Sequence, residues 1–174
     1  SVSAFEWFEG AQLTGVHCTA PPVSTAQAVA LGIALNGQQY STVRDFSFYD
    51  PPGQLNSTPT TGPASGGALI TIQGAGLRGG SVYRCGFGRA GAGDGGPAEV
   101  VNASLDDASG SLQCTAPAIT GEAIREVSIS LNAQQYVPLG ATSGRYSAYA
   151  PRHVESATPL VGPATGGTLV HFEL

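Results

Sequence analysis

Four short blocks of this chain recur about one hundred residues later, in the same order, and any fold has to accommodate that repetition. The matching blocks are HCTAPP at 17–22 with QCTAPA at 113–118, LNGQQY at 35–40 with LNAQQY at 131–136, FSFYDP at 46–51 with YSAYAP at 146–151, and STPTTGPASGGALITI at 57–72 with SATPLVGPATGGTLVHF from 156. The first two pairs are 96 residues apart and the last two are 100 apart. The difference predicts a four-residue insertion between Tyr136 and Tyr146, where we expect a hairpin tip because surface loops tolerate insertions.

The repeat predicts one complete unit flanked by two partial ones. We expect residues 1–51 to be the C-terminal half of a unit, 52–58 a linker, 59–151 a complete unit and 152–174 the N-terminal strands of a third. On this interpretation the chain is a window of a longer tandem array. The alternative is that the C-terminal strands of one chain complete the partial first unit of the next. Those two pieces together would still lack about 25 residues, including one cysteine-bearing strand.

The complete unit has the alternating pattern of β-strands. Within EVSISLN, the apolar residues Val127, Ile129 and Leu131 fall on one face and the serines between them on the other. The strand candidates are 67–73, 81–87, 98–105, 111–115, 124–132 and 145–149, with a short strand before Gly62. About seven strands separated by glycine and proline predict an all-β fold of tandem immunoglobulin-like β-sandwiches.

Composition narrows the class of protein. The 174 residues are 41% hydrophobic and only 11% charged, which favours a packed core over disorder. The net charge is −5 and the seven basic residues, all arginine, are scattered, which argues against a nucleic-acid partner. No run of 18 or more apolar residues occurs, so we expect no membrane span in this window.

The residues resemble those of the IPT/TIG family, the immunoglobulin-like modules of plexins, Met-type receptors, fibrocystin-like proteins and Rel-type transcription factors. The opening pattern of that family is similar to this chain at Pro59, Gly62, Pro63, Ser65, Gly66, Gly67, Ile70, Ile72, Gly74, Gly76 and Leu77. CGFG at 85–88, CTAP at 114–117, the SLN strand and YSAYAP also fit. The resemblance covers the whole chain and implies the fold; it says less about function, because the family serves adhesion, signalling, enzyme accessory domains and DNA binding alike.

Three cysteines are present, two of them in the complete unit. Cys85 and Cys114 lie on neighbouring strand candidates, and we expect them to form a disulfide; the alternative is two buried free thiols. Cys18 corresponds to Cys114 by the 96-residue offset, so its partner is expected about 11 positions before residue 1, outside the window. Disulfides indicate an oxidising compartment, and extracellular tandem IPT/TIG units often carry such pairs.

Two N-x-S/T sequons predict N-linked glycans. Asn56 lies in the Pro/Ser/Thr-rich segment taken as a linker, and Asn102 lies on a strand candidate. The same segment offers Thr58, Thr60 and Thr61 as hydroxyls for O-linked sugars.

Other motifs carry no chemistry in this context. GAGLRG at 74–79 satisfies G-x-G-x-x-G, but a strand candidate follows it where a dinucleotide site needs a helix. His17, His153 and His171 fall in three different units or junctions, and no zinc or nucleophile motif is present. The carboxylates of Asp106 and Asp107 lack calcium-loop spacing. We therefore expect no enzyme activity, no metal and no cofactor.

These observations favour a non-enzymatic structural module of an extracellular, tandem-repeat glycoprotein that forms a rod or fibril at a cell surface. The expected partners are neighbouring IPT/TIG units of the same chain or of like chains, and covalent glycans. The alternative is a ligand- or glycan-binding adhesion or receptor ectodomain, for which the sequence shows no clear aromatic or apolar patch. An accessory domain of a secreted carbohydrate-active enzyme and a Rel-type DNA-binding domain fit less well.

Overall fold

The computed structural model of the chain describes residues 4–9, 12–34, 36–89, 97–121, 123–150 and 152–174. Within these ranges every regular element is a β-strand and no helix is found. The chain divides into two units, Ser1–Pro51 and Pro52–Leu174. We describe each of them by itself.

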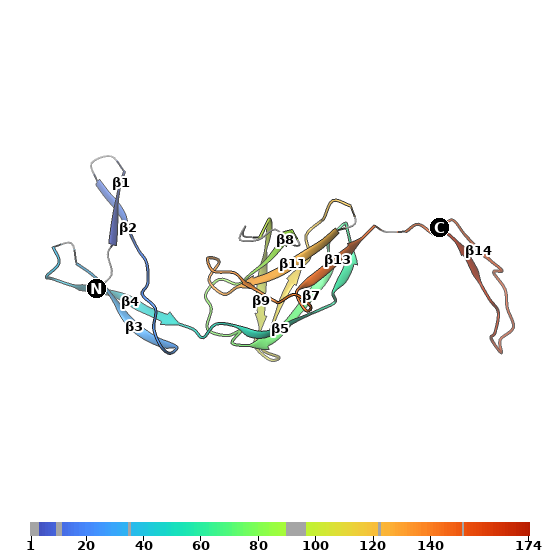
Figure 1. Cartoon of the computed structure of the whole chain (residues 1–174), viewed down its shortest axis with the longest axis horizontal. Coiled ribbons are helices and arrows are strands. Elements are labelled where there is room, and N and C mark those ends of the chain that lie inside the picture. Colours follow the sequence, from blue (N-terminus) through green and yellow to red (C-terminus); the bar gives the residue numbers. More distant parts are fainter. Residues whose placement is uncertain (1–3, 10–11, 35, 90–96, 122, 151) are drawn as a thin grey trace. The chain divides into compact units, whose positions relative to one another are not determined.

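Most of the second unit is one curled sheet, here called the central sandwich, built from strands β5 to β13 (Figure 1). The strands are β5 (Gly53–Thr58), β6 (Thr61–Pro63), β7 (Leu69–Ala75), β8 (Arg84–Arg89), β9 (Glu99–Asp106), β10 (Ser111–Thr115), β11 (Ala123–Ser130), β12 (Val137–Pro138) and β13 (Arg145–Tyr149). Their order across the sheet is β5-β7-β10-β9-β8-β11-β13-β6, with β12 beside β11. Among the strand pairs that the structure describes, β13–β6 alone is parallel. Because β5 and β6 follow one another in the chain yet lie at opposite ends of this order, the sheet folds over into two layers.

The core lies between these layers and follows from the alternation in the sequence. On β7, Ile70 and Ile72 are buried, while the flanking Leu69 and Gln73 are exposed. Val127 and Ile129 of β11 are buried in the same way. The largest buried side chains are those of Phe87 and Tyr146, whose rings meet edge to face with centroids 6.1 Å apart. The all-β, immunoglobulin-like fold expected from the sequence is therefore confirmed.

The segment 52–58, expected to be a linker, is mostly a strand of the sandwich. Gly53–Thr58 form β5, which pairs antiparallel with β7 and buries Leu55 and Ser57. The Ser57 hydroxyl donates a hydrogen bond of 2.8 Å to the carbonyl of Ser143. The physical reason is tertiary: β7 offers a free edge, and pairing satisfies the backbone groups of a segment whose composition alone resembles a loop.

The observed bounds also differ from the expected ones at β7, β8, β9 and β11, by a single residue in β9. Residues 67 and 68 lie outside β7 because Gly66 and Gly67 adopt φ of +79° and +87° and form a turn closed by Gly66 N–H to the Pro63 carbonyl. The backbone N–H groups of Ser81 and Val82 both donate hydrogen bonds to the Leu131 carbonyl. These residues lie outside β8, which starts at Arg84. The predicted strand 124–132 ends at Ser130. After it, the Asn132 side chain accepts the N–H groups of Gln134 and Gln135.

The first unit contains two hairpins. Strand β1 (Ala4–Glu9) pairs with β2 (Gln12–Cys18), and β3 (Gln27–Ile33) pairs with β4 (Ser41–Phe48). The β3–β4 register repeats that of β11–β13: Gln27 faces Phe48 as Ala123 faces Ala148, at offsets of 96 and 100 residues. The Asn36 side chain accepts hydrogen bonds from the N–H groups of Gln38 and Gln39. The Asn132 side chain accepts the equivalent hydrogen bonds in the central sandwich.

The described chain ends in a third piece, here called the C-terminal hairpin, in which β14 (Ser156–Thr158) pairs with β15 (His171–Glu173). Thr158 faces His171 as Thr58 faces Thr71, at an offset of 100 residues for both strands. The turn recurs as well, because Gly166 donates to the Pro163 carbonyl at 2.9 Å. The repetition seen in the sequence is thus also a repetition of backbone pairing in β3–β4 and in β14–β15, but not in β1–β2, where Ala4 faces Cys18 whereas Cys114 faces Ala103.

Candidate functional site

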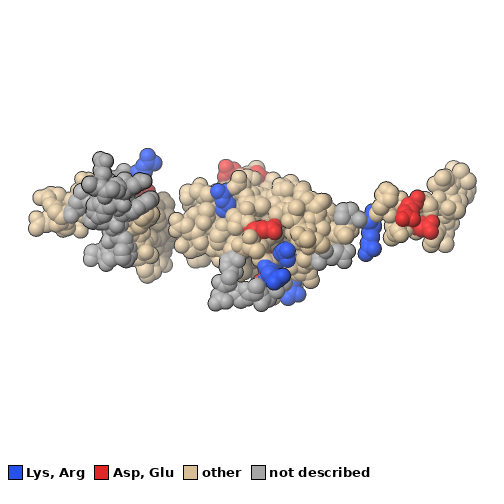
Figure 2. All heavy atoms as spheres, turned by 90° about the horizontal axis from the view of Figure 1, so that it is seen from above, with Lys and Arg blue, Asp and Glu red and all other residues tan. Residues whose placement is uncertain are grey.

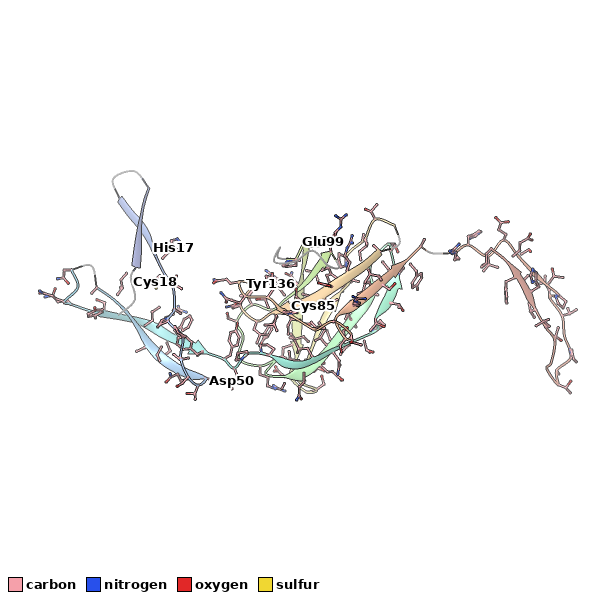
Figure 3. All side chains as sticks on the ribbon, in the orientation of Figure 1. His17, Cys18, Asp50, Cys85, Glu99 and Tyr136 are labelled. Carbon is pink, nitrogen blue, oxygen red and sulfur yellow. A yellow bond between two sulfur atoms is a disulfide. The ribbon has the colours of Figure 1, made fainter. Side chains whose placement is uncertain are left out.

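The disulfide between Cys85 and Cys114 lies inside the central sandwich, and Figure 3 labels Cys85 there. The S–S distance is 2.15 Å and the two Cα atoms are 6.4 Å apart. Cys85 is on β8 and Cys114 on β10, the two strands on either side of β9 in the sheet. Both cysteines are buried. The bond therefore ties together two strands that do not pair with each other.

Cys18 lies at the end of β2 in the first unit and is an exposed free thiol among the described residues (Figure 3). Its sequence counterpart is the disulfide-bonded Cys114 of β10. Within the described residues no second cysteine of the first unit is present to pair with it. The expected partner before residue 1 stays a prediction.

The first sequon lies on the strand at one end of the sheet order. Asn56 is exposed on β5, while the middle residue of the sequon, Ser57, points inward. Thr58, the hydroxyl residue of the sequon, is exposed at the end of β5. Thr60 and Thr61, the other candidates for O-linked sugars, are exposed in the connection to β6 and at its start. A sugar on any of these side chains would project away from the core.

The second sequon lies on a strand with neighbours on both sides. Asn102 is exposed on β9, between β10 and β8, and its side-chain carbonyl accepts a hydrogen bond from the Arg84 guanidinium. A shallow depression beside it is lined by Leu69, Ser104 and Gln113, among others. Both sequon asparagines are exposed, so either can carry a glycan. A glycan on Asn102 would replace the hydrogen bond from the Arg84 guanidinium.

The two neighbouring carboxylates at 106 and 107 are held by protein groups. The Asp106 carboxylate accepts hydrogen bonds from the Ser109 hydroxyl and the Ala108 N–H, and these two contacts lower the pKa of Asp106. Asp107 pairs with Arg78 at 3.2 Å. Together they fix the tight turn between β9 and β10, and no group of three or more metal-binding side chains occurs in the ranges that the structure describes.

The remaining motifs lie on ordinary β-structure. GAGLRG spans the end of β7 and the loop to β8, so a strand follows it. His17 is on β2, His171 on β15, and His153 precedes β14. Figure 2 shows the charged side chains in small separate groups on a face made mostly of uncharged residues. Searched over the described residues, the structure contains no helix with the length and apolar character needed to cross a membrane.

Sequence reasoning missed one group of surface residues. Apolar side chains are exposed on both partial pieces, including Leu31 and Phe46 in the first unit and Val170 and Phe172 in the C-terminal hairpin. Their counterparts in the central sandwich by the 96- and 100-residue offsets (Val127, Tyr146, Ile70 and Ile72) are all buried. The repeat alignment together with alternation would have identified these residues as counterparts of core positions.

Comparison with known proteins agrees with this geometry. Residues 55–146, which is more than half of the chain, match the IPT/TIG domain. A search of curated proteins finds no match. The matched range begins inside β5 and ends in β13, so it coincides with the central sandwich. IPT/TIG domains are generally non-catalytic, immunoglobulin-like modules with structural or adhesive roles. The chain therefore belongs to the IPT/TIG family.

Proposed function

We propose that this chain is a non-enzymatic structural part of an extracellular glycoprotein, in which IPT/TIG units in series form a rod or fibril at a cell surface. The observation that carries the proposal is the recurrence of strand registers at offsets of 96 and 100 residues on both sides of the matched domain. On this proposal 1–51 and 152–174 are parts of further units, and the central unit begins at Gly53. Each unit then contacts mainly its neighbours in a linear array.

The connections between units support a linear arrangement. Four residues, ending in Pro51 and Pro52, separate β4 from β5. Six residues separate β13 from β14, and Pro151 is among them. Short proline-containing connections restrict the backbone, because proline fixes φ and removes a donor. Units joined in this way would be spaced regularly.

The extracellular part of the proposal rests on the disulfide and the exposed sequons. A buried disulfide in a module of this size is typical of oxidising compartments. Asn56 and the three threonines near it form an exposed strip on and after β5, the edge strand. Sugars there would cover backbone groups that otherwise can pair with another sheet.

The glycan assignment predicts a mass difference. Asn56→Gln in the chain expressed through a eukaryotic secretory pathway should remove one N-linked glycan, because Asn56 is exposed on an edge strand. Intact mass before and after enzymatic deglycosylation measures this. Asn102→Gln is the matched comparison, and we expect a smaller occupancy at Asn102 because Arg84 contacts its amide. Equal masses for wild type and Asn56→Gln would contradict the assignment.

The rod proposal is tested by electron microscopy of the native material. A compact domain of about 95 residues is roughly 30–40 Å across, so filaments should show an axial repeat of one or two such lengths. Isolated globular particles, or filaments without a repeat in that range, would count against the proposed function.

A further inference from the structure

The depression on the outer face of the central sandwich lies directly beside the second sequon. Its volume is about 220 Å³. Its lining includes Asn102 and Ser104 on β9, Gln113 and Thr115 on β10, and Leu69 on β7. Two residues of the sequon, the asparagine that would carry a sugar and the serine that completes the motif, are therefore part of the lining.

The strand registers place the asparagine in one row with an apolar side chain. Thr115 faces Leu69 in the β10–β7 pair. Cys114 faces Ala103 in the β10–β9 pair, so the next residues of these antiparallel strands, Thr115 and Asn102, lie opposite each other. Because neighbouring strands are about 4.8 Å apart, Leu69 lies roughly 10 Å from Asn102, with Thr115 between them.

The chemistry of the lining suits a neutral sugar. Leu69 is 56% exposed although it lies within a strand. In the adjacent row, Gln113 faces Ser104 on one side and Thr71 on the other. Amide and hydroxyl groups can form hydrogen bonds with sugar hydroxyls, while an exposed aliphatic side chain can pack against the C–H groups of the ring. Every side chain of the lining is uncharged.

We propose that this depression binds the first sugar of a glycan on Asn102, the N-acetylglucosamine linked to the asparagine itself. That sugar lies over Thr115, with its acetyl methyl group against Leu69. Arg84 contacts Asn102 from β8, on the opposite side of β9 from β10, so the sugar exchanges that contact for contacts in the depression. The inference rests on the proposed function, because it requires the chain to be glycosylated.

Covalent attachment is the reason that the occupant is the chain's own glycan. The depression is shallow, and its volume is below the roughly 300–1,000 Å³ of pockets that hold free small molecules. A sugar already linked to a lining residue has a high effective concentration and loses little further freedom on entering the depression. We therefore expect the attached sugar to be ordered there and a free saccharide to bind only weakly.

Unfolding of glycosylated and unglycosylated chains tests the proposal. The Asn56→Gln chain is secreted from eukaryotic cells, the forms with and without a glycan on Asn102 are separated, and the glycan is trimmed to its first sugar. The glycosylated form should unfold at a midpoint about 4–8 °C higher, because its folded state gains contacts that the unfolded state lacks.

Two matched variants identify the contact. The difference between the two forms should largely disappear in Leu69→Ser. It should persist in Ile124→Ser, which changes a 47% exposed aliphatic residue on β11, outside the lining. Nuclear Overhauser contacts between the acetyl methyl protons of the sugar and the methyl protons of Leu69 are the second expected result.

The outcomes separate this proposal from the proposed function. Equal midpoints for the two forms, or the same difference in Leu69→Ser as in Ile124→Ser, would overturn it. So would micromolar binding of free chitobiose to the unglycosylated chain, because the depression would then serve a separate ligand. A wild-type chain with a glycan on Asn56 but none on Asn102 would remove this binding site and leave the glycoprotein proposal standing. A wild-type chain without either glycan would contradict both.

Discussion

Removing the Cys85–Cys114 disulfide should lower the free energy of unfolding of the central sandwich by about 3–4 kcal/mol. The bond joins residues 29 apart in the sequence, and closing a loop of that length removes conformational entropy from the unfolded chain by about this amount. The effect should be large relative to the total, because domains of this size are stable by only about 5–15 kcal/mol. The double variant Cys85→Ala, Cys114→Ala measured by urea unfolding with circular dichroism tests this.

The matched control is Cys18→Ser in the same chain. Cys18 is exposed and lies in the first unit, so its replacement should leave the transition of the central sandwich unchanged. A reducing agent should shift the wild-type midpoint toward that of the double variant and should not affect the double variant itself. If the double variant unfolds at the wild-type midpoint, the bond does not stabilise the sandwich.

Gly66→Ala should destabilise the central sandwich by about 2–5 kcal/mol. Two costs add: φ is +79° at this position, which costs an L-residue about 1–2 kcal/mol, and forced contacts in a packed region cost about 1–3 kcal/mol. The added Cβ would lie 2.7 Å from the Ala118 nitrogen and 2.8 Å from the Pro117 carbonyl carbon. These are backbone atoms, so a side-chain rotation cannot relieve the overlap. The midpoint of thermal or urea unfolding measures the loss.

Gly67→Ala separates the two costs. Its φ is +87°, but an added Cβ would meet nothing within 4 Å, so only the conformational cost of about 1–2 kcal/mol is expected. Gly166→Ala, in the C-terminal hairpin, should not change the transition of the central sandwich. Equal losses for Gly66→Ala and Gly67→Ala would show that the close approach to the segment 116–118 is unimportant.

Local patterns were sufficient where each strand alternates and ends at a glycine or proline. The strands around Ile70, Leu112 and Val127 were expected from such patterns, and the structure has strands at all three places. The same reasoning failed at 53–58. A Pro/Ser/Thr-rich composition is typical of exposed segments, and β5 is largely exposed because it is an edge strand in which only Leu55 and Ser57 are buried. It also extended the strand at 124–132 past Ser130, since the Asn132 turn depends on side-chain hydrogen bonds that a periodicity does not reveal.

At the candidate sites, the sequence identified which residues could be modified or cross-linked, but it did not show what surrounds each of them. The sequons at Asn56 and Asn102 are equivalent as motifs, yet one lies on an edge strand and the other between two strands beside Arg84. Cys85 and Cys114 form a buried disulfide across β9, an arrangement that their residue identities alone leave open. Such environments depend on which strands are neighbours, and neighbours in a sheet are set by contacts far apart in the chain.

The amino-acid sequence alone determined that this protein is all-β, that short sequence blocks recur at offsets of 96 and 100 residues, and that its central part is an IPT/TIG domain. These properties follow from alternation, turn residues and recurring blocks, which act over a few residues at a time. Only the tertiary structure decided that Gly53–Thr58 form a strand and that Gly66 lies against the backbone of 116–118. Strand neighbours and burial arise from long-range pairing, so they become visible only once the sheet is assembled.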